Sequence, residues 1–178
     1  MELRLERCTI RDWRLDDADS LAEHANNRWI SINLRDAFPY PYTIEDANKF
    51  LRRATTEVPT TKFCIEIDGR AVGGIGLRPG EDVHRLTAEF GYWLAEEFWG
   101  QGIMSEVVIA FVDYCFANFP LNRIFAAAYA NNPASARVLK KAGFVLEGRL
   151  RKNVIKDEKI LDSLLYAKTK YNQPCTIL

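Results

Sequence analysis

Residues 96–111, EEFWGQGIMSEVVIAF, place two glycines directly before a helical pattern. The apolar side chains that follow recur at the spacing of one helical face: Met104, Val107, Val108, Phe111, Val112 and Cys115. Upstream of the glycines, LTAEFGYWL (residues 86–94) is a strand-like run rich in aromatic residues. The local order is therefore strand, glycine loop, helix.

This order is typical of a site for a phosphate or pyrophosphate. Glycines let the backbone approach a ligand closely and adopt unusual dihedral angles. A helix N-terminus adds unpaired N–H groups and the positive end of a dipole. The alternative is a tight strand-to-helix turn that binds nothing, and Gly100 and Gly102 alone leave both interpretations open.

The composition predicts one globular domain over residues 1–178. Apolar residues make up 48% and charged residues 27%, which suits a sizeable core, and the formal net charge is 0. A neutral chain gives no reason to expect a nucleic-acid or membrane partner. Neither an apolar run of the ~18 residues that span a bilayer nor a signal peptide is present, so we expect a cytoplasmic protein.

The cysteines and histidines show no metal-ligand spacing. The chain has no CxxC pair, and its histidines lie near none of its four cysteines in sequence: Cys8, Cys64, Cys115, Cys175, His24 and His84. We therefore predict buried free thiols and no metal.

The remaining pattern predicts a mixed α/β (α+β) fold with one central sheet. Expected helices lie after Asp16 or Asp17, over 44–56 behind a Thr43 cap, over 103–118 and over 133–142. Expected strands lie at 9–13, in a hairpin around Asp68-Gly69, at 86–94 and 122–130, and in a closing pair at 144–154 and 159–169. Residues 28–43, broken by Pro39 and Pro41, are expected to be irregular.

Three stretches resemble the GNAT superfamily of acyl-CoA N-acyltransferases, and within it the RimJ/RimL branch of ribosomal-protein N-terminal acetyltransferases. They are EFGYWLAEEFWGQGIMSE (89–106), NNPASARVLKKAGFVLEGRLR (131–151) and FPYPYTIEDANKFL (38–51). The resemblance implies a single GNAT domain with a splayed, mostly antiparallel sheet flanked by helices. It also implies a monomer or a homodimer.

The resemblance further implies acetyl-CoA as co-substrate, without a metal. The acetyl group would pass to a primary amine, on a protein N-terminus or a small molecule, by direct attack with both substrates bound. The positions that match the coenzyme site are Trp93, Leu94, Phe98, Trp99, Gly100, Gln101, Gly102, Ile103, Met104, Ser105, Asn132, Ser135 and Lys140.

The chain departs from the family pattern at two positions. Glu97 occupies the first place of the loop, where the family usually has Gln or Arg, and we expect it to face away from the pyrophosphate. Leu139 occupies the place of a tyrosine that in many members protonates the departing thiolate. Ser135 is the predicted replacement as thiolate donor, and Asn132 is predicted to bind the pantetheine arm. The alternative for Asn132 is a plain helix cap.

Glu89 is the predicted general base, because a carboxylate inside an aromatic strand requires a reason. An ion pair or an exposed sheet face would also explain it, and Tyr92, His84 or a water relay remain alternatives. Backbone donors for the oxyanion are expected near Trp93 and Leu94. The predicted acceptor pocket is aromatic: Trp29, Tyr40, Tyr42 and Tyr92.

Two other functions are alternatives to N-acetyl transfer. A module of the same fold that binds acyl-CoA without catalysis is compatible with Leu139 and with an ion-paired Glu89. A dinucleotide site in GGIGLRP (73–79) is not, because Pro79 is where the last glycine of G-x-G-x-x-G should stand, and no GK[ST] motif follows a glycine loop.

Overall fold

The computed structural model describes residues 1–170, so Cys175 and the last eight residues of the predicted domain lie outside the described part. Within it, one sheet contains all strands in the order β1-β2-β3-β4-β5-β6-β8-β7. The strands are β1 (Glu2–Arg4), β2 (Thr9–Asp12), β3 (Lys62–Ile67), β4 (Arg70–Pro79), β5 (Thr87–Leu94), β6 (Arg123–Tyr129), β7 (Val145–Lys156) and β8 (Lys159–Thr169). Every neighbouring pair is antiparallel except β5 and β6.

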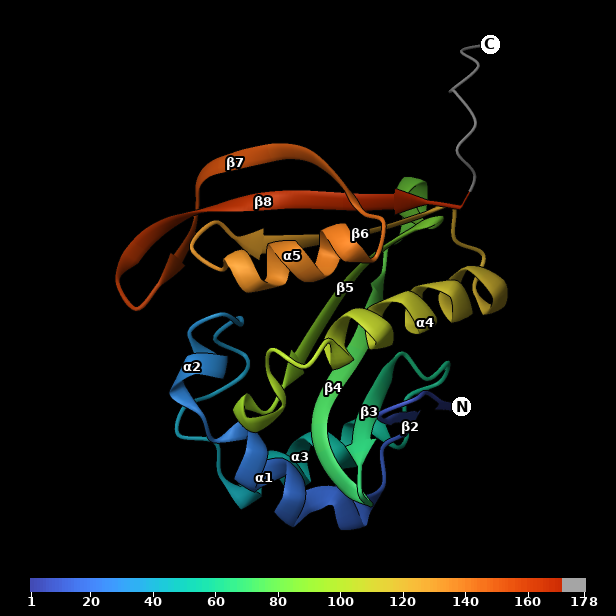
Figure 1. Cartoon of the computed structure of the whole chain (residues 1–178), viewed down its shortest axis with the longest axis vertical. Helices are drawn as coiled ribbons and strands as arrows, with labels where there is room; N and C mark the ends of the chain where they lie inside the picture. The colour runs from blue at the N-terminus through green and yellow to red at the C-terminus, as the bar shows by residue number, and fades with distance from the viewer. Residues whose placement is uncertain (171–178) are drawn as a thin grey trace.

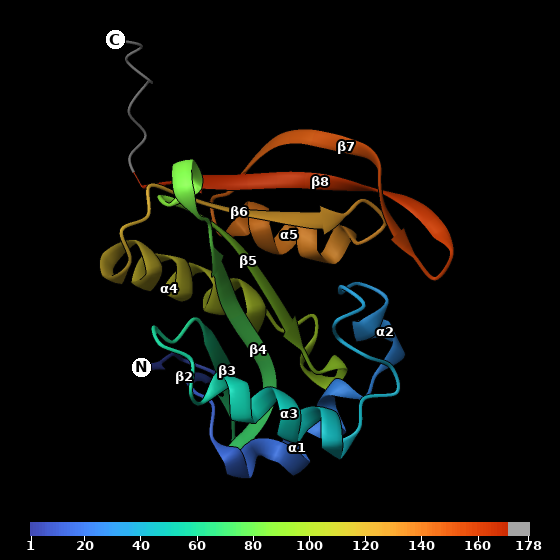
Figure 2. The ribbon, with the colours of Figure 1, turned by 180° about the vertical axis from the view of Figure 1, so that it is seen from behind.

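The helices cover both faces of the sheet. They are α1 (Ala18–Ala25), α2 (Arg28–Ser31), α3 (Ile44–Ala54), α4 (Ile103–Asn118) and α5 (Pro133–Lys141). Helices α4 and α5 lie on the face turned toward the viewer in Figure 1. Helices α1 and α3 lie on the opposite face, seen in front in Figure 2. The short α2 lies beside the far end of β6 and the tip of the β7–β8 hairpin.

Each face carries its own apolar core. The larger core packs the predicted face of α4, including fully buried Val107, Val108 and Phe111, against Phe63 and Phe90 of the sheet. The smaller core packs helices α1 and α3 on the other face, around Trp13, Leu21 and Leu51. Burial of both faces fixes the alternation of β5, so that Phe90 faces one core and Trp93 the other.

The sheet opens between β5 and β6. These two parallel strands pair only over Thr87–Glu89 and Arg123–Phe125. Beyond that point β5 continues beside β4 and β6 continues beside β8, and Figure 1 shows the two halves of the sheet running in different directions. The predicted mixed fold with a splayed, mostly antiparallel sheet is thus confirmed.

Local signals explain most element boundaries. Helix α4 spans the predicted residues 103–118, and Thr43 caps α3 by accepting the Asp46 N–H at 3.2 Å. Asp68 (φ 49°) and Gly69 (φ 76°) form the predicted hairpin turn. Two elements were not predicted: β1, and α2 in the stretch expected to be irregular.

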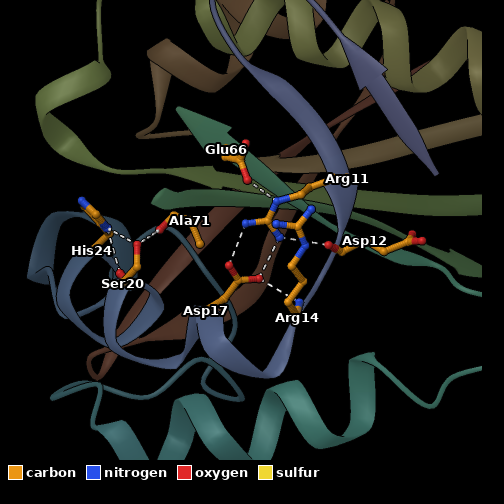
Figure 3. Close-up of polar contacts among 8 residues, drawn as sticks. All are labelled: Arg11, Asp12, Arg14, Asp17, Ser20, His24, Glu66 and Ala71. Atoms are coloured by element: carbon orange, nitrogen blue, oxygen red, sulfur yellow. Dashed lines mark hydrogen bonds and ion pairs between the residues drawn. The ribbon is translucent and has the colours of Figure 1, made fainter. Parts of the chain in front are cut away.

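A buried ion cluster joins α1 to the sheet (Figure 3). Arg11 of β2 donates from Nη1 and Nη2 to the two carboxylate oxygens of Asp17, at 2.8 and 2.7 Å, and from Nε to Glu66 of β3. The Arg14 N–H also donates to Asp17 at 2.8 Å. Asp17 is therefore the helix-start residue that the sequence indicates, but its carboxylate mainly anchors Arg11.

Cys8, Cys64 and Cys115 are buried free thiols, as predicted. Burial raises the pKa of the Cys8 thiol to about 11 and raises the pKa values of Cys64 and Cys115 further. Over residues 1–170, no helix is long and apolar enough to cross a membrane.

Candidate active site

A cavity of about 410 Å³ occupies the opening between β5 and β6. One wall comes from β5 and the loop that follows it, and another from β6 and α5. Residues of the α2 segment reach it from the opposite face of the sheet, so the cavity connects the two faces. Its described lining residues are Trp29, Ile30, Asn33, Leu34, Phe90–Leu94, Phe98–Gly100, Gly102–Ser105, Ala126–Tyr129, Asn132, Ala134, Ser135, Arg137, Val138 and Lys141.

The glycine loop directs the start of α4 at this cavity. Gly100 (φ 76°) and Gly102 (φ 85°) both have the left-handed backbone that favours glycine, and Gly102 is the N-cap residue of α4. The first N–H groups of a helix have no partner within it, and here they belong to Ile103 and Met104, which line the cavity. The helix start therefore offers donors and a positive dipole to an anion.

Arg7, which the sequence did not single out, holds this loop from the β1–β2 connection. Its Nη1 donates to the carbonyl oxygen of Gln101. The same atom lies 3.6 Å from the position that a Cβ on Gly102 would take. Gln101 is the one predicted loop residue, between Phe98 and Ser105, that does not line the cavity.

Glu97 faces away from the cavity. Its carboxylate lies 3.2 Å from Nε2 of His24, a buried residue of α1, and its side chain is 61% exposed. His24 itself is held through Nδ1, 2.8 Å from the Ser20 carbonyl oxygen (Figure 3). The acidic residue at the start of the loop therefore contacts α1 rather than the loop's anion-binding side.

Ser135, Asn132 and Tyr92 meet where α5 begins. The Asn132 side chain accepts the Ser135 N–H at 3.1 Å, so the helix cap foreseen as an alternative is present. The Ser135 hydroxyl lies 2.8 Å from the Tyr92 hydroxyl of β5. Burial raises the pKa of Tyr92 to about 12, although the bond to Ser135 works in the opposite direction. Leu139, in contrast, is fully buried in the larger core and is not a lining residue.

The backbone of β5 offers N–H groups to the open side of the sheet. The Ala95 N–H donates to the Val72 carbonyl of β4 at 2.8 Å. Because backbone direction alternates along a strand, the N–H groups of Leu94 and Tyr92 point the other way, toward the cavity. The N–H of Trp93 points toward β4. Of the two oxyanion donors expected from the sequence, Leu94 has the suitable direction.

The opposite wall is made of small side chains. Ala126, Ala127 and Ala128 follow one another in β6 and all line the cavity. Alanine is uncommon in strands, so this run is the signal in the sequence that could have marked β6 as a wall of the cavity. Lys141 lines the cavity, whereas the predicted Lys140 does not.

Glu89 lies on the α2 side of the sheet and is paired with Arg35. The Arg35 Nη2 is 2.5 and 2.6 Å from the two carboxylate oxygens, and the Glu89 side chain is 23% exposed. Glu89 is not among the lining residues, although its neighbour Phe90 is. His84, the other titratable alternative, belongs to a short 3-10 turn between β4 and β5 and also lies outside the lining.

Of the predicted acceptor aromatics, Trp29 and Tyr92 line the cavity. Tyr42 is buried in the smaller core against Phe38, with ring centroids 4.9 Å apart. Tyr40 lies on the surface under the guanidinium of Arg28, 5.6 Å from the ring centroid. These two tyrosines do not line the cavity. Three residues of the α2 segment that the sequence did not indicate do line it: Ile30, Asn33 and Leu34.

The comparisons with known proteins agree with this geometry. The acetyltransferase (GNAT) domain profile matches residues 7–145. The chain is 32% identical over 154 residues to the putative ribosomal N-acetyltransferase YdaF of Bacillus subtilis, covering 82% of each chain. It is 33% identical over 106 residues to the ribosomal-protein-serine acetyltransferase of Escherichia coli, covering 60% of this chain and 59% of the relative.

A solved structure shares both the fold and part of the sequence. RimJ of Mycobacterium smegmatis, in complex with CoA-disulfide, superposes with a TM-score of 0.81 at 26% identity, covering 92% of this chain and 82% of RimJ. Fold, glycine loop and relatives lead to one family. The chain belongs to the GNAT acetyltransferases, as an N-acetyltransferase similar to the ribosomal-protein acetyltransferases.

Proposed function

We propose that the protein uses acetyl-CoA and transfers the acetyl group directly to an α-amine at a protein N-terminus. The observation that carries this proposal is the cavity that crosses the sheet, with a helix N-terminus at one side and the α2 segment at the other. Such a cavity suits two substrates that enter from opposite faces and meet in the middle. The name of the Mycobacterium smegmatis complex supports coenzyme A as the first of them.

The loop residues fit the coenzyme's pyrophosphate. The N–H groups of residues 98–104 and the start of α4 would hold it, because both glycines have a backbone that keeps side chains away from it. Lys141 and Arg137, the two cations of the lining, would neutralise the charge from α5. The pantetheine arm would lie beside the alanines of β6, where the Asn132 amide can bond it. What acetyl-CoA supplies is an activated acetyl group on a thiol leaving group.

Acyl transfer requires donors for two developing negative charges. The Leu94 N–H would bond the carbonyl oxygen as it gains charge. The Ser135 hydroxyl would bond the sulfur as the C–S bond breaks, in place of the phenol that Leu139 lacks. In the balanced reaction the N–C bond forms, the C–S bond breaks, the amine loses one proton and the sulfur gains one.

The composition of the lining supports an α-amine acceptor. Among the described residues that line the cavity, none is Asp, Glu or His. At pH 7 roughly one α-amine in seven is uncharged, for a pKa of ~7.8, but only roughly one alkylamine in 2,500, for a pKa of ~10.4. A site with no carboxylate or imidazole among its described lining residues therefore suits the less basic amine. The names of the relatives point the same way, because they refer to ribosomal proteins.

Glu89 remains the proposed base, acting through water. Its carboxylate lies on the α2 face, from which the acceptor would enter, but Arg35 holds both oxygens. A bridging water could pass the amine proton to it without any side chain moving into the cavity.

The test is a thiol-release assay at pH 7 with acetyl-CoA and three acceptors. The first is a peptide with a free α-amine. The second is the same peptide with its N-terminus acetylated and an internal lysine added, and the third is spermidine. We expect the free peptide to have the highest kcat/KM by at least tenfold. Equal or higher kcat/KM for spermidine would refute the α-amine acceptor. Absence of thiol release with every amine would refute the transfer reaction at this cavity.

A further inference from the structure

We infer that Tyr92 is a positioning residue that orients the Ser135 hydroxyl toward the coenzyme sulfur. The inference rests on the proposed role of Ser135 as thiolate donor and adds a second residue, from a different element, to that role. Tyr92 comes from β5 and Ser135 from the first turn of α5, 43 positions apart in sequence. The sequence suggested Tyr92 as part of the acceptor wall and as an alternative general base.

The distances show which group the phenol oxygen is bonded to. The Tyr92 hydroxyl is 2.8 Å from the Ser135 hydroxyl oxygen but 3.4 Å from the Ser135 carbonyl oxygen. O–H···O bonds have a usual length of 2.5–3.0 Å, so the carbonyl is too far to compete. The two hydroxyls therefore share one bond, and one of them must be its donor.

The chemistry of the two groups decides the donor. A phenol is a far stronger acid than an aliphatic alcohol, so the better arrangement has Tyr92 donate and Ser135 accept. Burial of Tyr92 raises its pKa to about 12, so the phenol keeps its hydrogen at neutral pH. The single hydrogen of Ser135 is then left for another acceptor, and the cavity lies beside it.

Both residues are held firmly enough for this direction to matter. Asn132 caps α5 through the Ser135 N–H at 3.1 Å, which fixes the serine backbone. The Tyr92 ring packs on Phe90, with centroids 5.7 Å apart, and Phe90 packs on Phe144 at 5.1 Å. Hydrogen bonds in a chain also polarise one another, so the serine hydrogen becomes a better donor.

The proton balance leaves Tyr92 unchanged. When the C–S bond breaks, its electron pair stays on sulfur, and the Ser135 hydroxyl stabilises the thiolate by donating a hydrogen bond to it. The thiolate then takes a proton from solvent, and the proton that the amine has lost passes through water and Glu89 to the same solvent. Tyr92 and Ser135 both keep their hydrogens, because a phenol with a raised pKa and an aliphatic alcohol are both weaker acids than a thiol.

A double-mutant cycle tests the inference, with Tyr92→Phe, Ser135→Ala and the combined variant. Tyr114→Phe is the matched control, because it removes a phenol oxygen from a tyrosine that packs on Phe63 and Phe119 and does not line the cavity. We measure kcat at saturating acetyl-CoA, the Kd of coenzyme A and the thermal unfolding of each variant.

We expect Tyr92→Phe to lower kcat by about three- to tenfold, as loss of one hydrogen bond in the transition state would, with little change in coenzyme Kd. In the Ser135→Ala background the same substitution should have no further effect, because Tyr92 acts only through Ser135. Multiplied losses in the combined variant, or wild-type kcat in Tyr92→Phe, would overturn the inference.

One further outcome separates this inference from the proposed function. If Ser135→Ala keeps wild-type kcat while Tyr92→Phe is impaired, the thiolate role of Ser135 fails and the inference fails with it, whereas N-acetyl transfer stands.

If Tyr92→Phe does not fold, a fluorinated tyrosine at position 92 replaces it. Its kcat should then fall as pH rises through the lowered phenol pKa, and a flat profile would overturn the inference.

Discussion

Glu89 illustrates how one neighbouring side chain can change the role that the sequence suggests for a residue. Its position in the aromatic strand suggests a base, yet Arg35, 54 residues away in sequence, holds both carboxylate oxygens. For Glu89→Gln we expect kcat/KM for an α-amine acceptor to fall about tenfold at pH 7 and to recover partly at higher pH. Recovery follows because the uncharged fraction of the acceptor grows toward its pKa of ~7.8 and needs no base.

Glu147→Gln is the matched control, since Glu147 is also paired with an arginine, Arg123, but lies on β7 outside the cavity lining. It should leave the pH profile of kcat/KM unchanged. A Glu89→Gln enzyme with full activity at pH 7 would exclude Glu89 as base. A loss of stability with an unchanged pH profile would assign the Arg35 pair a structural role.

At the scale of residues, contacts between side chains far apart in the chain could not be predicted from the sequence. Ser135 and the loop residues around Gly102 could be indicated as site residues because local motifs carry them. The Tyr92–Ser135 bond, the Arg35–Glu89 pair and the Arg7–Gln101 contact could not, because each joins residues brought together only by the folded sheet. Tyr40 and Tyr42 show the converse: they are close together in a predicted site motif, yet Tyr42 packs in the smaller core and Tyr40 lies on the surface under Arg28, and neither lines the cavity.

At the scale of elements, the glycine loop and α4 act as a unit, and Gly102→Val tests it. Gly102 has a φ of 85°, so valine there is strained by about 1–2 kcal/mol, although its Cβ would meet only Arg7, at 3.6 Å. We expect coenzyme A affinity to fall at least tenfold by calorimetry, with a modest loss in thermal stability, because the helix N–H groups lose their direction.

Gly148→Val serves as the control for Gly102→Val. Gly148 lies in β7, has no positive φ, and a Cβ there meets nothing within 4 Å. It should bind coenzyme A as the wild type does. Unchanged affinity in folded Gly102→Val would remove the pyrophosphate from this loop.

The start of α3 gives a pH-dependent prediction. The Thr43 N–H and hydroxyl donate to the Asp46 carboxylate at 3.0 and 2.9 Å, and these bonds lower its pKa in the folded state. A lowered folded pKa stabilises the fold above the unfolded value of ~3.9, and the stabilisation is lost as pH falls through the folded pKa. Thr43→Ala removes the hydroxyl that caps α3 at the Asp46 N–H, and loss of this cap should reduce the free energy of unfolding by about 1 kcal/mol at pH 7.

In acid this difference should shrink, because protonated Asp46 no longer accepts both bonds as a carboxylate. Urea unfolding of Thr43→Ala and wild type at neutral and acidic pH measures it. Thr60→Ala is the control, since its hydroxyl makes only a 3.4 Å bond to the Glu57 carbonyl. An equal Thr43→Ala effect at both pH values would mean that Asp46 plays no part in the cap.

At the scale of the whole molecule, the Arg11 cluster joins the β-sheet to α1; Arg11 and Asp17 are buried and Glu66 is partly buried. Arg11→Ala leaves Asp17 and Glu66 without their cation, and removing one partner of a buried pair costs about 3–5 kcal/mol. Arg4→Ala removes the partner of Glu2 from an exposed pair, with the Arg4 side chain 83% exposed, and should change stability by less than about 0.5 kcal/mol. Denaturant unfolding measures the loss in free energy of unfolding for both variants, and equal losses for Arg11→Ala and Arg4→Ala would contradict the stabilising role of the cluster.

At the scale of the whole molecule, the order of the strands in the sheet could not be predicted from the sequence. Periodicity and turn residues identify β3 and β4 as a hairpin and α4 as a buried helix, because those signals are local. The placement of β8 between β6 and β7, and the short β5–β6 pairing that opens the cavity, depend on contacts across the chain. The same holds for the hairpin tip, where Lys156 and Asp157 bind Asp36 and Arg28 beside α2.

The most direct test of the account is to locate the acetyl group on the product. The protein is mixed with acetyl-CoA and a peptide that carries both a free α-amine and an internal lysine, and the modified peptide is sequenced by mass spectrometry. We predict one acetyl group, on the α-amine, with one thiol released for each peptide modified. Acetylation of the lysine alone, or thiol release without any acetylated peptide, would contradict it.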